Sequence, residues 1–455
     1  MNPPDHPIAN RRITVVGLGK SGAAVARFCR QQGARVTVTD VAARELFPEE
    51  VRALEALDVA LEFGGHQPAT FEKADLVVVS PGVPHTLGPV AAARDRGTPV
   101  IGEIELAARY IEAPILAVTG TNGKTTTTEL IGAMLAASGI SVFVGGNIGN
   151  PLIDYVSDGL RHDWLVVEVS SFQLDTIDGF RPRIGVLLNV SADHLDRYPD
   201  LAAYAASKFQ LFVNQGAGDT AVLNAADPFC RSAAQRAPGQ VLMFGAAADQ
   251  TQPGARIAAD HIVFQLAHGA PHRIDLDRWS LAGGHNRENA AAAGLAALCA
   301  GATPESVQTA IDTFQGLAHR LSHVRTVQGV RYYDDSKATN VDAVCRALEG
   351  FDAPVVLVMG GRDKGGGYRA LEDLVAAKVR ALIVMGEAAD VIQAALGHLV
   401  PTHRAGDMAE AVQRAADQAR TGDVVLLSPA CASFDMYASY HQRGEDFCRH
   451  VQQLT

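Results

Sequence analysis

The segment Val118-Thr-Gly-Thr-Asn-Gly-Lys-Thr-Thr126 carries the residue types that bind nucleotide phosphates. Backbone N–H groups of the loop can surround phosphate oxygens, the Lys124 ammonium can reach the terminal phosphates, and the Thr125 hydroxyl can face magnesium. Val118 stands where the general phosphate-binding loop has its first glycine. An ordinary glycine turn would not need a Lys-Thr pair here. We therefore predict an ATP site at Gly120, Thr121, Asn122, Gly123, Lys124, Thr125 and Thr126.

Polar groups also follow two later strands. Glu168 ends an apolar strand, where a lone carboxylate is costly unless a cation or hydrogen bonds compensate it, so a metal ligand is the natural interpretation. His194 closes Asn189-Val-Ser-Ala-Asp-His194 after the next strand and, taken alone, reads as a hydrogen-bonded loop histidine. It becomes a candidate because Glu168 and the phosphate loop should end at the same edge of the sheet.

The segment Gly17-Leu-Gly-Lys-Ser-Gly22 follows a strand and opens a helix, and Asp40 ends the next strand. This pattern fits a dinucleotide fingerprint. Its physics is less specific, because glycines let the backbone approach any nucleotide diphosphate at a helix N-terminus. NAD(P) and another nucleoside diphosphate therefore both stay open. Ser80-Pro-Gly-Val-Pro84 is a turn at the end of a strand, where open α/β sheets bind ligands.

The second half of the chain carries four further polar segments. In Gly284-His-Asn-Arg-Glu-Asn289, the two asparagines are three residues apart and share a helix face, which fits helix capping or base recognition. Asp334–Asn340, Gly360–Gly367 and Ser428–Phe434 each follow a strand. A surface turn is the alternative for the first of these, but the three loops could converge on one sheet edge.

The elements that must position these residues alternate between strands and helices, which predicts an α/β fold. A length of 455 residues suggests about three domains. We expect a Rossmann-like domain at 1–102, a central P-loop domain at 103–315 and a second Rossmann-like domain at 316–455. The predicted helices are Gly22–Gln32, Pro48–Leu57, Lys124–Ala137 and Leu201–Phe212. The predicted strands are Ile13–Gly17, Arg35–Asp40, Leu76–Ser80, Ile115–Val118, Trp164–Val169, Ile184–Asn189, Val330–Tyr333, Val355–Met359, Ala381–Met385 and Val424–Leu427.

The composition excludes several classes of protein. A formal charge of −11 disfavours a nucleic-acid surface, which needs a dense Lys/Arg footprint. No apolar window is long enough to span a membrane, and the first ten residues do not resemble a secretory signal, so we expect a cytoplasmic protein. The six cysteines show no CxxC pairing, which predicts reduced thiols without a zinc site.

Together these segments resemble the Mur ligase family, and most closely its branch that adds D-glutamate to UDP-N-acetylmuramoyl-L-alanine. The resemblance covers nearly the whole chain. TGTNGKTT resembles the family's ATP loop, and DDSKATN is the most discriminating string because the sister ligases differ there. The remaining strings follow in the family's order: VVEVSSFQL, NVSADHLDRY, the Tyr204-to-Lys208 segment, GGHNRENAAAA, LAHR and SPACASFD.

The resemblance implies a monomeric ligase that uses ATP and two magnesium ions, with UDP-N-acetylmuramoyl-L-alanine and glutamate as substrates. By motif, Lys124, His194 and Lys208 would be catalytic, and Thr125, Glu168, His194 and Lys208 would hold metal. Asn286, Asn289, Arg320 and Asp335 would complete the ATP site. The UDP substrate would contact Gly19, Lys20, Ser21, Gly22, Ser80, Gly82 and Asn147. Glutamate would contact Lys337, Thr339, Lys364, Ser433 and Tyr440.

The resemblance changes the interpretation of Lys208. From its helical context this residue reads as a solvated surface lysine, whereas it matches the lysine that the family carbamylates into a metal-bridging carboxylate. A carbamate supplies the oxygens that magnesium prefers, and neighbouring cations favour the neutral amine that carbamylation requires.

Two positions depart from the family pattern. Tyr440 stands where some relatives have Phe, and no Arg directly follows Asp40-Val41, so Arg44 is the alternative contact for the UDP diphosphate. The resemblance favours UDP over NAD in the first domain. Folylpolyglutamate synthase shares a similar ATP loop but lacks a preceding Rossmann-like unit. A dehydrogenase leaves Lys124, Glu168 and DDSKATN without a purpose, and a non-catalytic nucleotide-binding regulator is the remaining alternative. The sequence does not distinguish D- from L-glutamate.

Overall fold

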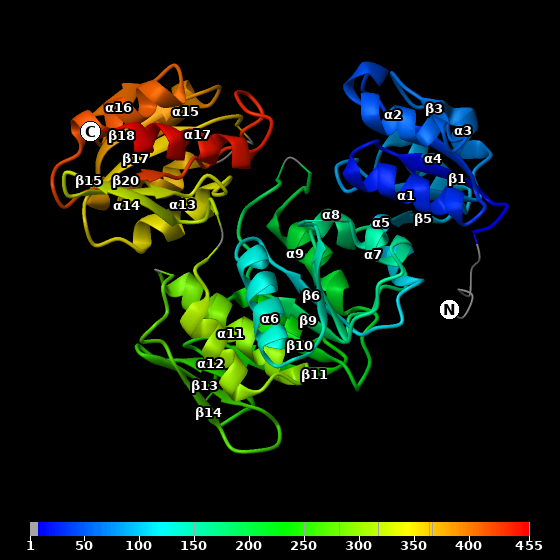
Figure 1. Cartoon of the computed structure of the whole chain (residues 1–455), viewed down its shortest axis with the longest axis horizontal. Coiled ribbons are helices and arrows are strands. Elements are labelled where there is room, and N and C mark those ends of the chain that lie inside the picture. The colour runs from blue at the N-terminus through cyan, green and yellow to red at the C-terminus, as the bar shows by residue number, and fades with distance from the viewer. Residues whose placement is uncertain are drawn as a thin grey trace. The chain divides into compact units, whose positions relative to one another are not determined.

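The computed structural model describes residues 8–149, 151–195, 197–249, 251–281, 283–316, 318–363, 365 and 367–454. The chain divides into two compact units. The first comprises Met1–Val190, Ala202–Asp275 and Ala290–Ala310, and the second comprises Ser191–Leu201, Leu276–Asn289 and Ile311–Thr455. The described residues form three sheets, two in the first unit and one in the second (Figure 1). The predicted α/β class is confirmed, while the domain limits at 102/103 and 315/316 stay predictions.

The amino-terminal sheet has five parallel strands in the order β3-β2-β1-β4-β5. Its central strands are apolar and buried, as expected for parallel strands covered on both faces. Its two edge strands, β3 and β5, have three residues each and were not predicted. The elements are β1 (Arg12–Val16), α1 (Lys20–Gln31), β2 (Arg35–Thr39), η1 (Arg44–Leu46), α2 (Pro48–Glu55), β3 (Ala60–Glu62), α3 (Pro68–Glu72), β4 (Leu76–Val79), α4 (Gly88–Asp95), β5 (Val100–Gly102) and α5 (Glu103–Ala108).

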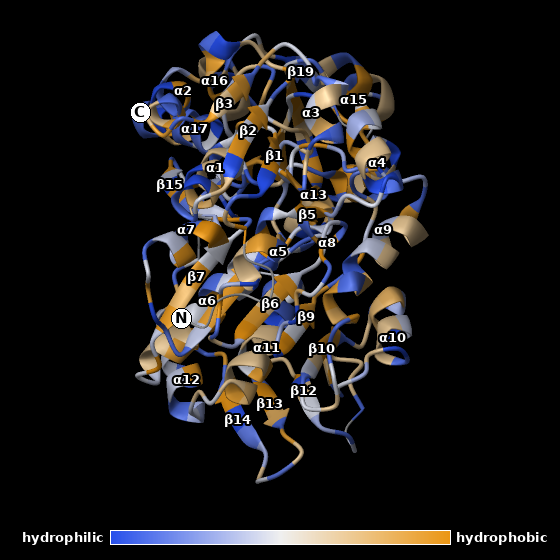
Figure 2. Cartoon of the chain, turned by 90° about the vertical axis from the view of Figure 1, so that its right-hand side faces the viewer, coloured by the Kyte–Doolittle hydropathy of each residue, from blue (hydrophilic) through white to orange (hydrophobic). Residues whose placement is uncertain are grey.

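The central sheet has nine strands in the order β14-β13-β12-β11-β10-β9-β6-β8-β7. The predicted strands correspond to its buried parallel centre, and Figure 2 shows β6 largely in the hydrophobic colour. The antiparallel β12-β13-β14 edge was not predicted. Strands and their following helices begin with β6 (Ile115–Thr119), α6 (Lys124–Ala137), β7 (Val142–Gly146), α7 (Leu152–Ser157), β8 (Trp164–Glu168), α8 (Ser171–Leu174) and β9 (Ile184–Leu187).

The rest of this sheet and the helices that cover it follow in chain order. The predicted helix at Leu201–Phe212 ends earlier, at Phe209, and continues as a 3-10 turn. The elements are α9 (Leu201–Phe209), η2 (Gln210–Phe212), β10 (Thr220–Asn224), α10 (Pro228–Ala234), β11 (Gln240–Phe244), β12 (Gly254–Ile257), β13 (His261–Gln265), β14 (His272–Asp275), α11 (Gly284–Cys299) and α12 (Pro304–Thr313).

The second unit contains a six-stranded sheet in the order β15-β16-β20-β17-β18-β19. Strands β16, β20 and β17 are neighbours and parallel, so the three polar loops that follow them leave the same edge, as predicted. The elements are β15 (Ser322–Val327), β16 (Val330–Asp334), α13 (Val341–Glu349), β17 (Val355–Gly360), η3 (Tyr368–Leu371), α14 (Glu372–Lys378), β18 (Val379–Met385), α15 (Ala389–Leu396), β19 (Thr402–Arg404), α16 (Met408–Gln418), β20 (Val424–Leu427) and α17 (Tyr440–Gln453).

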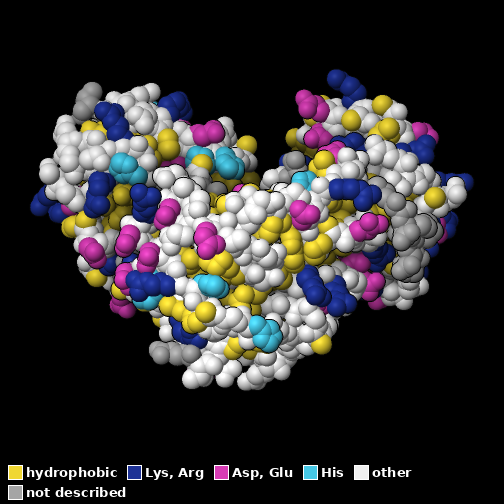
Figure 3. Space-filling model, turned by 60° about the horizontal axis from the view of Figure 1, so that its bottom comes forward, with side chains coloured by type: hydrophobic (Ala, Val, Ile, Leu, Met, Phe, Trp, Pro, Cys, Tyr) yellow, Lys and Arg dark blue, Asp and Glu magenta, His cyan; other side chains and the backbone are white. Residues whose placement is uncertain are grey.

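The charged side chains and the cysteines are distributed as the sequence predicted. On the face drawn in Figure 3, acidic and basic side chains are interspersed. All six cysteines are free thiols. Within the described ranges, no helix combines the length and the apolar character that crossing a membrane requires.

Candidate active site

The phosphate loop connects β6 to α6 and has a backbone that glycine makes possible. Gly123 directly precedes α6 and has a φ of 86°, in the left-handed region that favours glycine. Asn189 clamps the loop from the end of β9, because its side chain accepts from the Asn122 N–H at 2.9 Å and donates to the Asn122 carbonyl at 3.1 Å. Asn189 therefore attaches the phosphate loop to the segment that follows β9.

Two lysine side chains converge on this loop. Lys124 Nζ donates to the carbonyl oxygens of Gly120 and Thr121 at 3.0 and 2.8 Å. Lys208 Nζ donates to the same Gly120 oxygen at 2.9 Å and lies 4.3 Å from the centre of the Tyr204 ring. Lys208 is only 1% exposed, so the interpretation as a solvated surface lysine is wrong. Its position on α9 carries no sequence signal for this burial, which tertiary packing creates.

Glu168 occupies the end of β8 beside the phosphate loop and is 2% exposed. Its carboxylate accepts from the Thr125 hydroxyl at 2.7 Å and from the Asn147 amide at 3.0 Å. A hydroxyl, a carboxylate and an amide provide the hard oxygen donors that magnesium prefers. Among the described residues, no group of three or more His, Cys, Asp or Glu side chains forms a complete metal site. The oxygen donors of Thr125, Glu168 and Asn147 fit magnesium, which typically also takes phosphate oxygens and water.

The glycine-rich loop after β1 is held by Asp40 and Ser80, which follow the neighbouring strands β2 and β4. A Cβ at Gly22 would lie 1.9 Å from the Gly17 carbonyl oxygen, so only glycine fits at this position in the first turn of α1. Ser80 donates to the same Gly17 oxygen at 2.9 Å. The two oxygens of Asp40 accept from the backbone N–H groups of Leu18 and Ala42 at 2.7 and 2.8 Å. Asp40 thus holds the loop, which argues against its role as a ribose ligand in a dehydrogenase.

The other predicted UDP contacts lie on the same loop or near it. Gly19 caps α1, Lys20 and Ser21 open that helix, and Gly82 follows Ser80 in the neighbouring turn. Lys20 Nζ donates to the Gly149 carbonyl at 2.6 Å, which brings it to the segment that carries Asn147. Arg44, in η1, pairs with Glu55 of α2 at 2.5 Å. The roles of these residues toward UDP stay predictions.

His194 belongs to the second unit and has a left-handed backbone with a φ of 56°. Its N–H donates to the Asp193 carboxylate at 2.9 Å, and Asp193 in turn accepts from the Asn340 amide at 3.0 Å. Asn340 also caps α13 by accepting from Ala343 N–H at 2.8 Å. The segment before α9 is thus anchored to the loop after β16. A metal-binding role for His194 stays a prediction.

Two asparagines predicted to contact ATP, Asn286 and Asn289, lie in the first two turns of α11. Asn289 donates its side-chain amide to the Asn286 side-chain oxygen at 3.2 Å, and both residues are buried. This arrangement confirms that they share a helix face. The hydrogen bond orients the two amides, and recognition of a base stays a prediction.

Asp335 follows β16 and is buried. Its carboxylate accepts from the Ser428 hydroxyl at 2.9 Å and from the Leu321 N–H at 3.2 Å. Burial nevertheless raises the pKa of Asp335 to about 7, against the lowering effect of these hydrogen bonds and of Arg320. The charge of Arg320 therefore acts on the Asp335 carboxylate, and both residues were predicted from the sequence to contact ATP.

The predicted glutamate contacts gather where the loops after β16 and β20 meet α17. Lys337 Nζ lies 4.0 Å from the centre of the Tyr440 ring, and the Ser336 hydroxyl donates to the Tyr440 carbonyl at 2.9 Å. Ser433 is buried and accepts on its carbonyl from Tyr437 N–H at 2.8 Å. Thr339 lies in the loop after β16 and is partly buried. Lys364 lies outside the described residues.

Arg443 on α17 is an organising residue that the sequence did not reveal. It is 2% exposed, and burial lowers the pKa of its guanidinium to about 10. Its Nε donates to Ser336 Oγ at 3.0 Å, and one terminal nitrogen donates to the Ser336 carbonyl at 2.8 Å and to the Cys431 carbonyl at 3.1 Å. A longer bond of 3.3 Å reaches the Gly360 carbonyl. One side chain therefore ties together the three loops at this sheet edge.

A buried His–Asp pair lies next to Arg443 and was also not singled out. His319 Nδ1 is 2.6 Å from Asp334 Oδ2, and this carboxylate raises the pKa of the imidazole. Both residues fall inside strings that the family resemblance uses, LAHR and DDSKATN, which is the signal that could have found them. His319 has a left-handed φ of 62°, so the pair fixes a backbone position that favours glycine.

A Gly-Lys-Thr loop between a parallel strand and a helix, with a buried carboxylate at the end of the neighbouring strand, defines a P-loop nucleotide-binding domain. The chain belongs to the Mur ligase family. Residues 118–297 match the Mur ligase middle domain, residues 11–102 match the Mur ligase MurD-like N-terminal domain, and residues 319–431 match the Mur ligase, glutamate ligase domain. These three matches confirm the predicted family and its three-domain architecture.

Two similar proteins are named UDP-N-acetylmuramoylalanine–D-glutamate ligase. The protein of Desulfatibacillum aliphaticivorans is 51% identical over 447 residues, covering 98% of this chain and 99% of its own length. The protein of Desulfosudis oleivorans is 51% identical over 445 residues, covering 98% and 97%. The fold resembles that of a pseudomurein peptide ligase from Methanothermus fervidus, with a TM-score of 0.63, 18% identity and coverage of 98% and 100%.

Proposed function

We propose that this protein joins D-glutamate to UDP-N-acetylmuramoyl-L-alanine in an ATP-dependent reaction that forms an amide bond and releases ADP and phosphate. The observation that carries the proposal is the pairing of Lys124 and Lys208 on the Gly120 carbonyl, beside the buried Glu168 that holds Thr125. This combination brings two lysine side chains and a carboxylate to one phosphate loop. The names of the relatives at 51% identity supply the substrates.

The chemistry follows from what must happen to a carboxylate before an amine can attack it. The carboxylate of the UDP substrate attacks the γ-phosphorus of ATP, the bond to the bridging oxygen breaks, and ADP leaves an acyl phosphate behind. The glutamate amine then attacks the acyl carbon, loses a proton, and the tetrahedral intermediate expels inorganic phosphate. Lys124 stabilises negative charge on the phosphoryl group during transfer, and positioning of the reactants contributes most of the rest.

Thr125 and Glu168 would hold magnesium, which supplies charge neutralisation on the phosphates when it is bound. His194 would contribute to a second metal position. Lys208 would act as a carbamate, because this group replaces a buried ammonium with oxygens suited to hard cations. Asn286, Asn289, Arg320 and Asp335 would complete the ATP site, and the UDP and glutamate contacts are those predicted from the sequence. A monomeric state and a cytoplasmic location are part of the proposal.

The experiment that tests this function is an assay of phosphate release with omission of single substrates. Release should require ATP, UDP-N-acetylmuramoyl-L-alanine and D-glutamate together, and mass spectrometry should detect the product one glutamyl residue heavier than the acceptor. L-Glutamate and D-alanine serve as controls for the amino acid. Equal release with water alone would indicate a plain nucleotide phosphatase and would contradict the proposal.

A further inference from the structure

Helix α5 carries two buried carboxylates that the proposed reaction does not use. Glu103 and Glu105 lie at the start of this helix, immediately after β5 of the amino-terminal sheet, and each is 1% exposed. An isolated buried carboxylate is costly, so each needs partners that compensate its burial. The two residues differ sharply in the partners they have.

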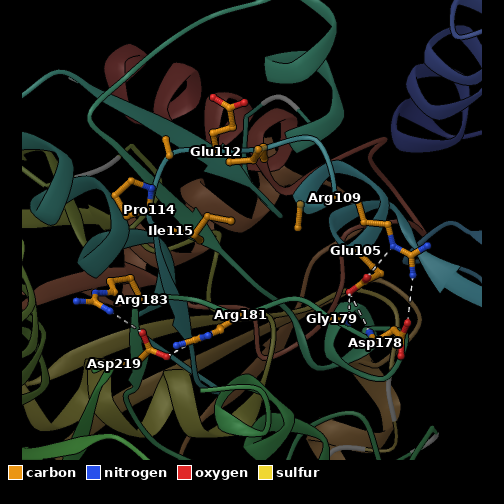
Figure 4. A pocket seen from close by; sticks show the side chains of 13 residues that line it. Glu105, Arg109, Glu112, Pro114, Ile115, Asp178, Gly179, Arg181, Arg183 and Asp219 are labelled. Atoms are coloured by element: carbon orange, nitrogen blue, oxygen red, sulfur yellow. Dashed lines mark hydrogen bonds and ion pairs between the residues drawn. The ribbon is translucent and has the colours of Figure 1, made fainter. Parts of the chain in front are cut away.

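Glu105 is fully satisfied and has a structural role. Its Oε2 accepts from the backbone N–H groups of Asp178, Gly179 and Phe180 at 2.9, 3.0 and 2.8 Å. Its Oε1 accepts from Arg109 Nε at 2.9 Å (Figure 4). These bonds fasten α5 to the segment that precedes β9.

The cavity beside Glu105 does not provide a better candidate site. This space has a volume of about 590 Å³ and borders Ile115, the first residue of β6. Figure 4 shows the side chains that line it. Its arginines are paired, because Arg109 contacts Glu105 and Asp178, while Arg181 and Arg183 share Asp219. The cavity lies at the amino end of the strands, whereas the phosphate loop leaves their carboxyl end.

Glu103 faces a different element, the first turn of α7. Its Oε1 accepts from Ile153 N–H at 2.7 Å, and the neighbouring Leu152 N–H also stabilises the carboxylate. Oε2 is buried and has no hydrogen-bond partner in the described part of the chain. Burial raises the pKa of Glu103 to about 7 despite the two backbone groups. One oxygen of Glu103 therefore caps the start of α7, while the other is buried without a hydrogen bond.

The segment just before α7 contacts both Lys20, after the glycine-rich loop of the amino-terminal sheet, and Glu168, beside the phosphate loop. Asn147 is attached to Glu168 by two bonds, from its backbone N–H to the Glu168 carbonyl at 2.9 Å and from its side-chain amide to the carboxylate at 3.0 Å. Two residues on, the Gly149 carbonyl accepts from Lys20 Nζ at 2.6 Å. Glu103 provides a third attachment where α7 begins, so residues 147–149 are held at both ends.

We propose that Glu103 is a positioning residue for the acceptor substrate: by capping the first turn of α7, it keeps Asn147 against Glu168 and Gly149 against Lys20. The inference rests on the proposed function, in which Asn147 and Lys20 contact the UDP-linked substrate. Loss of the cap leaves buried N–H groups of α7 without an acceptor, and the start of the helix must shift to reach another partner. The shift moves residues 147–149 and leaves the Lys124 loop in place.

The kinetic test compares Glu103→Ala and Glu103→Gln with wild type in the phosphate-release assay. Glutamine keeps the accepting oxygen, whereas alanine removes it. Glu103→Ala should raise the KM for UDP-N-acetylmuramoyl-L-alanine at least tenfold, with the KM for ATP within twofold of wild type. Glu103→Gln should restore the acceptor KM to within threefold. An unchanged acceptor KM in Glu103→Ala, or equal increases in both KM values, would overturn the proposal.

Glu105→Gln is the matched control on the same helix. Because its partners hold the segment before β9, this variant should lower the melting temperature without changing the ratio of the two KM values. A Glu105→Gln variant that reproduces the selective rise in acceptor KM would show that general loosening of α5 is sufficient, and would overturn a specific role for Glu103.

Hydrogen–deuterium exchange separates this inference from the proposed function. In ligand-free Glu103→Ala, exchange should increase in residues 147–157 and stay at the wild-type level in residues 176–183. If the alanine variant does not fold, Glu103→Asp replaces it, because its side chain is shorter by one methylene. Exchange in residues 147–157 is then again compared with exchange in residues 176–183. Unchanged exchange in 147–157 would contradict the positioning role whatever the substrates are. Failure of wild type to ligate D-glutamate would instead contradict only the proposed function.

Discussion

Lys124 and Lys208 donate hydrogen bonds to one and the same oxygen, the carbonyl of Gly120, at 3.0 and 2.9 Å. The two residues are 84 positions apart, one on the phosphate loop and one buried on α9. Two ammonium groups on a single acceptor repel each other, and both compete for the space that phosphate and magnesium need. Conversion of Lys208 to a carbamate removes one positive charge and adds two oxygens at this point.

We therefore expect Lys208→Ala to be nearly inactive while it remains folded. Acetate or formate at millimolar concentration should restore part of the turnover, because a small carboxylate can occupy the space of the missing carbamate. Lys73→Ala, which removes an exposed lysine, is the control and should keep wild-type turnover. ¹³C NMR after incubation with labelled bicarbonate should show a carbamate signal in wild type that Lys208→Ala lacks. Full activity of Lys208→Ala would contradict the role of this residue.

Replacement of the other lysine should affect the chemical step itself. Lys124→Ala should lower kcat by on the order of 10²- to 10³-fold or more, because removal of a preorganised charge at the transferring group has effects of this size. The melting temperature should change little, since the two carbonyls that accept from Lys124 Nζ, those of Gly120 and Thr121, belong to its own loop. Phosphate release and product formation should fall together. Turnover within a factor of a few of wild type would show that Lys124 does not act on the phosphate.

The sequence predicted the parts of this fold that depend on local pattern. Continuous apolar runs such as β6 and β8 are buried and were found. The edge strands were missed, because β3 has only three residues and β14 exposes Arg273 and Asp275. The phosphate loop was found for the same reason, since its spacing is local. Arg443 was missed because its partner Ser336 is 107 residues away, and a buried arginine has the same appearance in sequence as a solvated one.

Arg443 allows a prediction about the amino-acid side of the site. Arg443→Lys keeps the charge but loses the planar group that reaches Ser336 and Cys431 together, so the loops after β16 and β20 should loosen. The KM for D-glutamate should rise about tenfold or more, and the KM for the UDP substrate should stay within twofold. Arg404→Lys, at an exposed ion pair in the same sheet, is the control. Equal changes in both KM values would show a global effect on the enzyme instead.

The pKa of Asp335 leads to a prediction about stability and pH. Burial raises this pKa to about 7 in the folded protein, compared with 3.8 for an unperturbed aspartate. Protonation therefore favours folding, and the stabilisation is complete below pH 4, decreases as the pH rises toward 7, and is lost above it. The largest contribution to the slope is about 1.4 kcal/mol per pH unit. Glu103 contributes with the same sign, since burial raises its pKa to about 7 as well.

Asp335→Asn, which stays neutral at every pH, should reduce this slope. The unfolding midpoint of wild type, measured by differential scanning calorimetry between pH 5 and 8, should fall more steeply than that of Asp335→Asn below pH 7, and the two curves should run parallel above pH 7.5. Asp352→Asn replaces an exposed carboxylate and should leave the wild-type slope unchanged. If Asp335→Asn has the wild-type slope, the carboxylate is already ionised in the folded protein, and Arg320 with Ser428 compensates its burial completely.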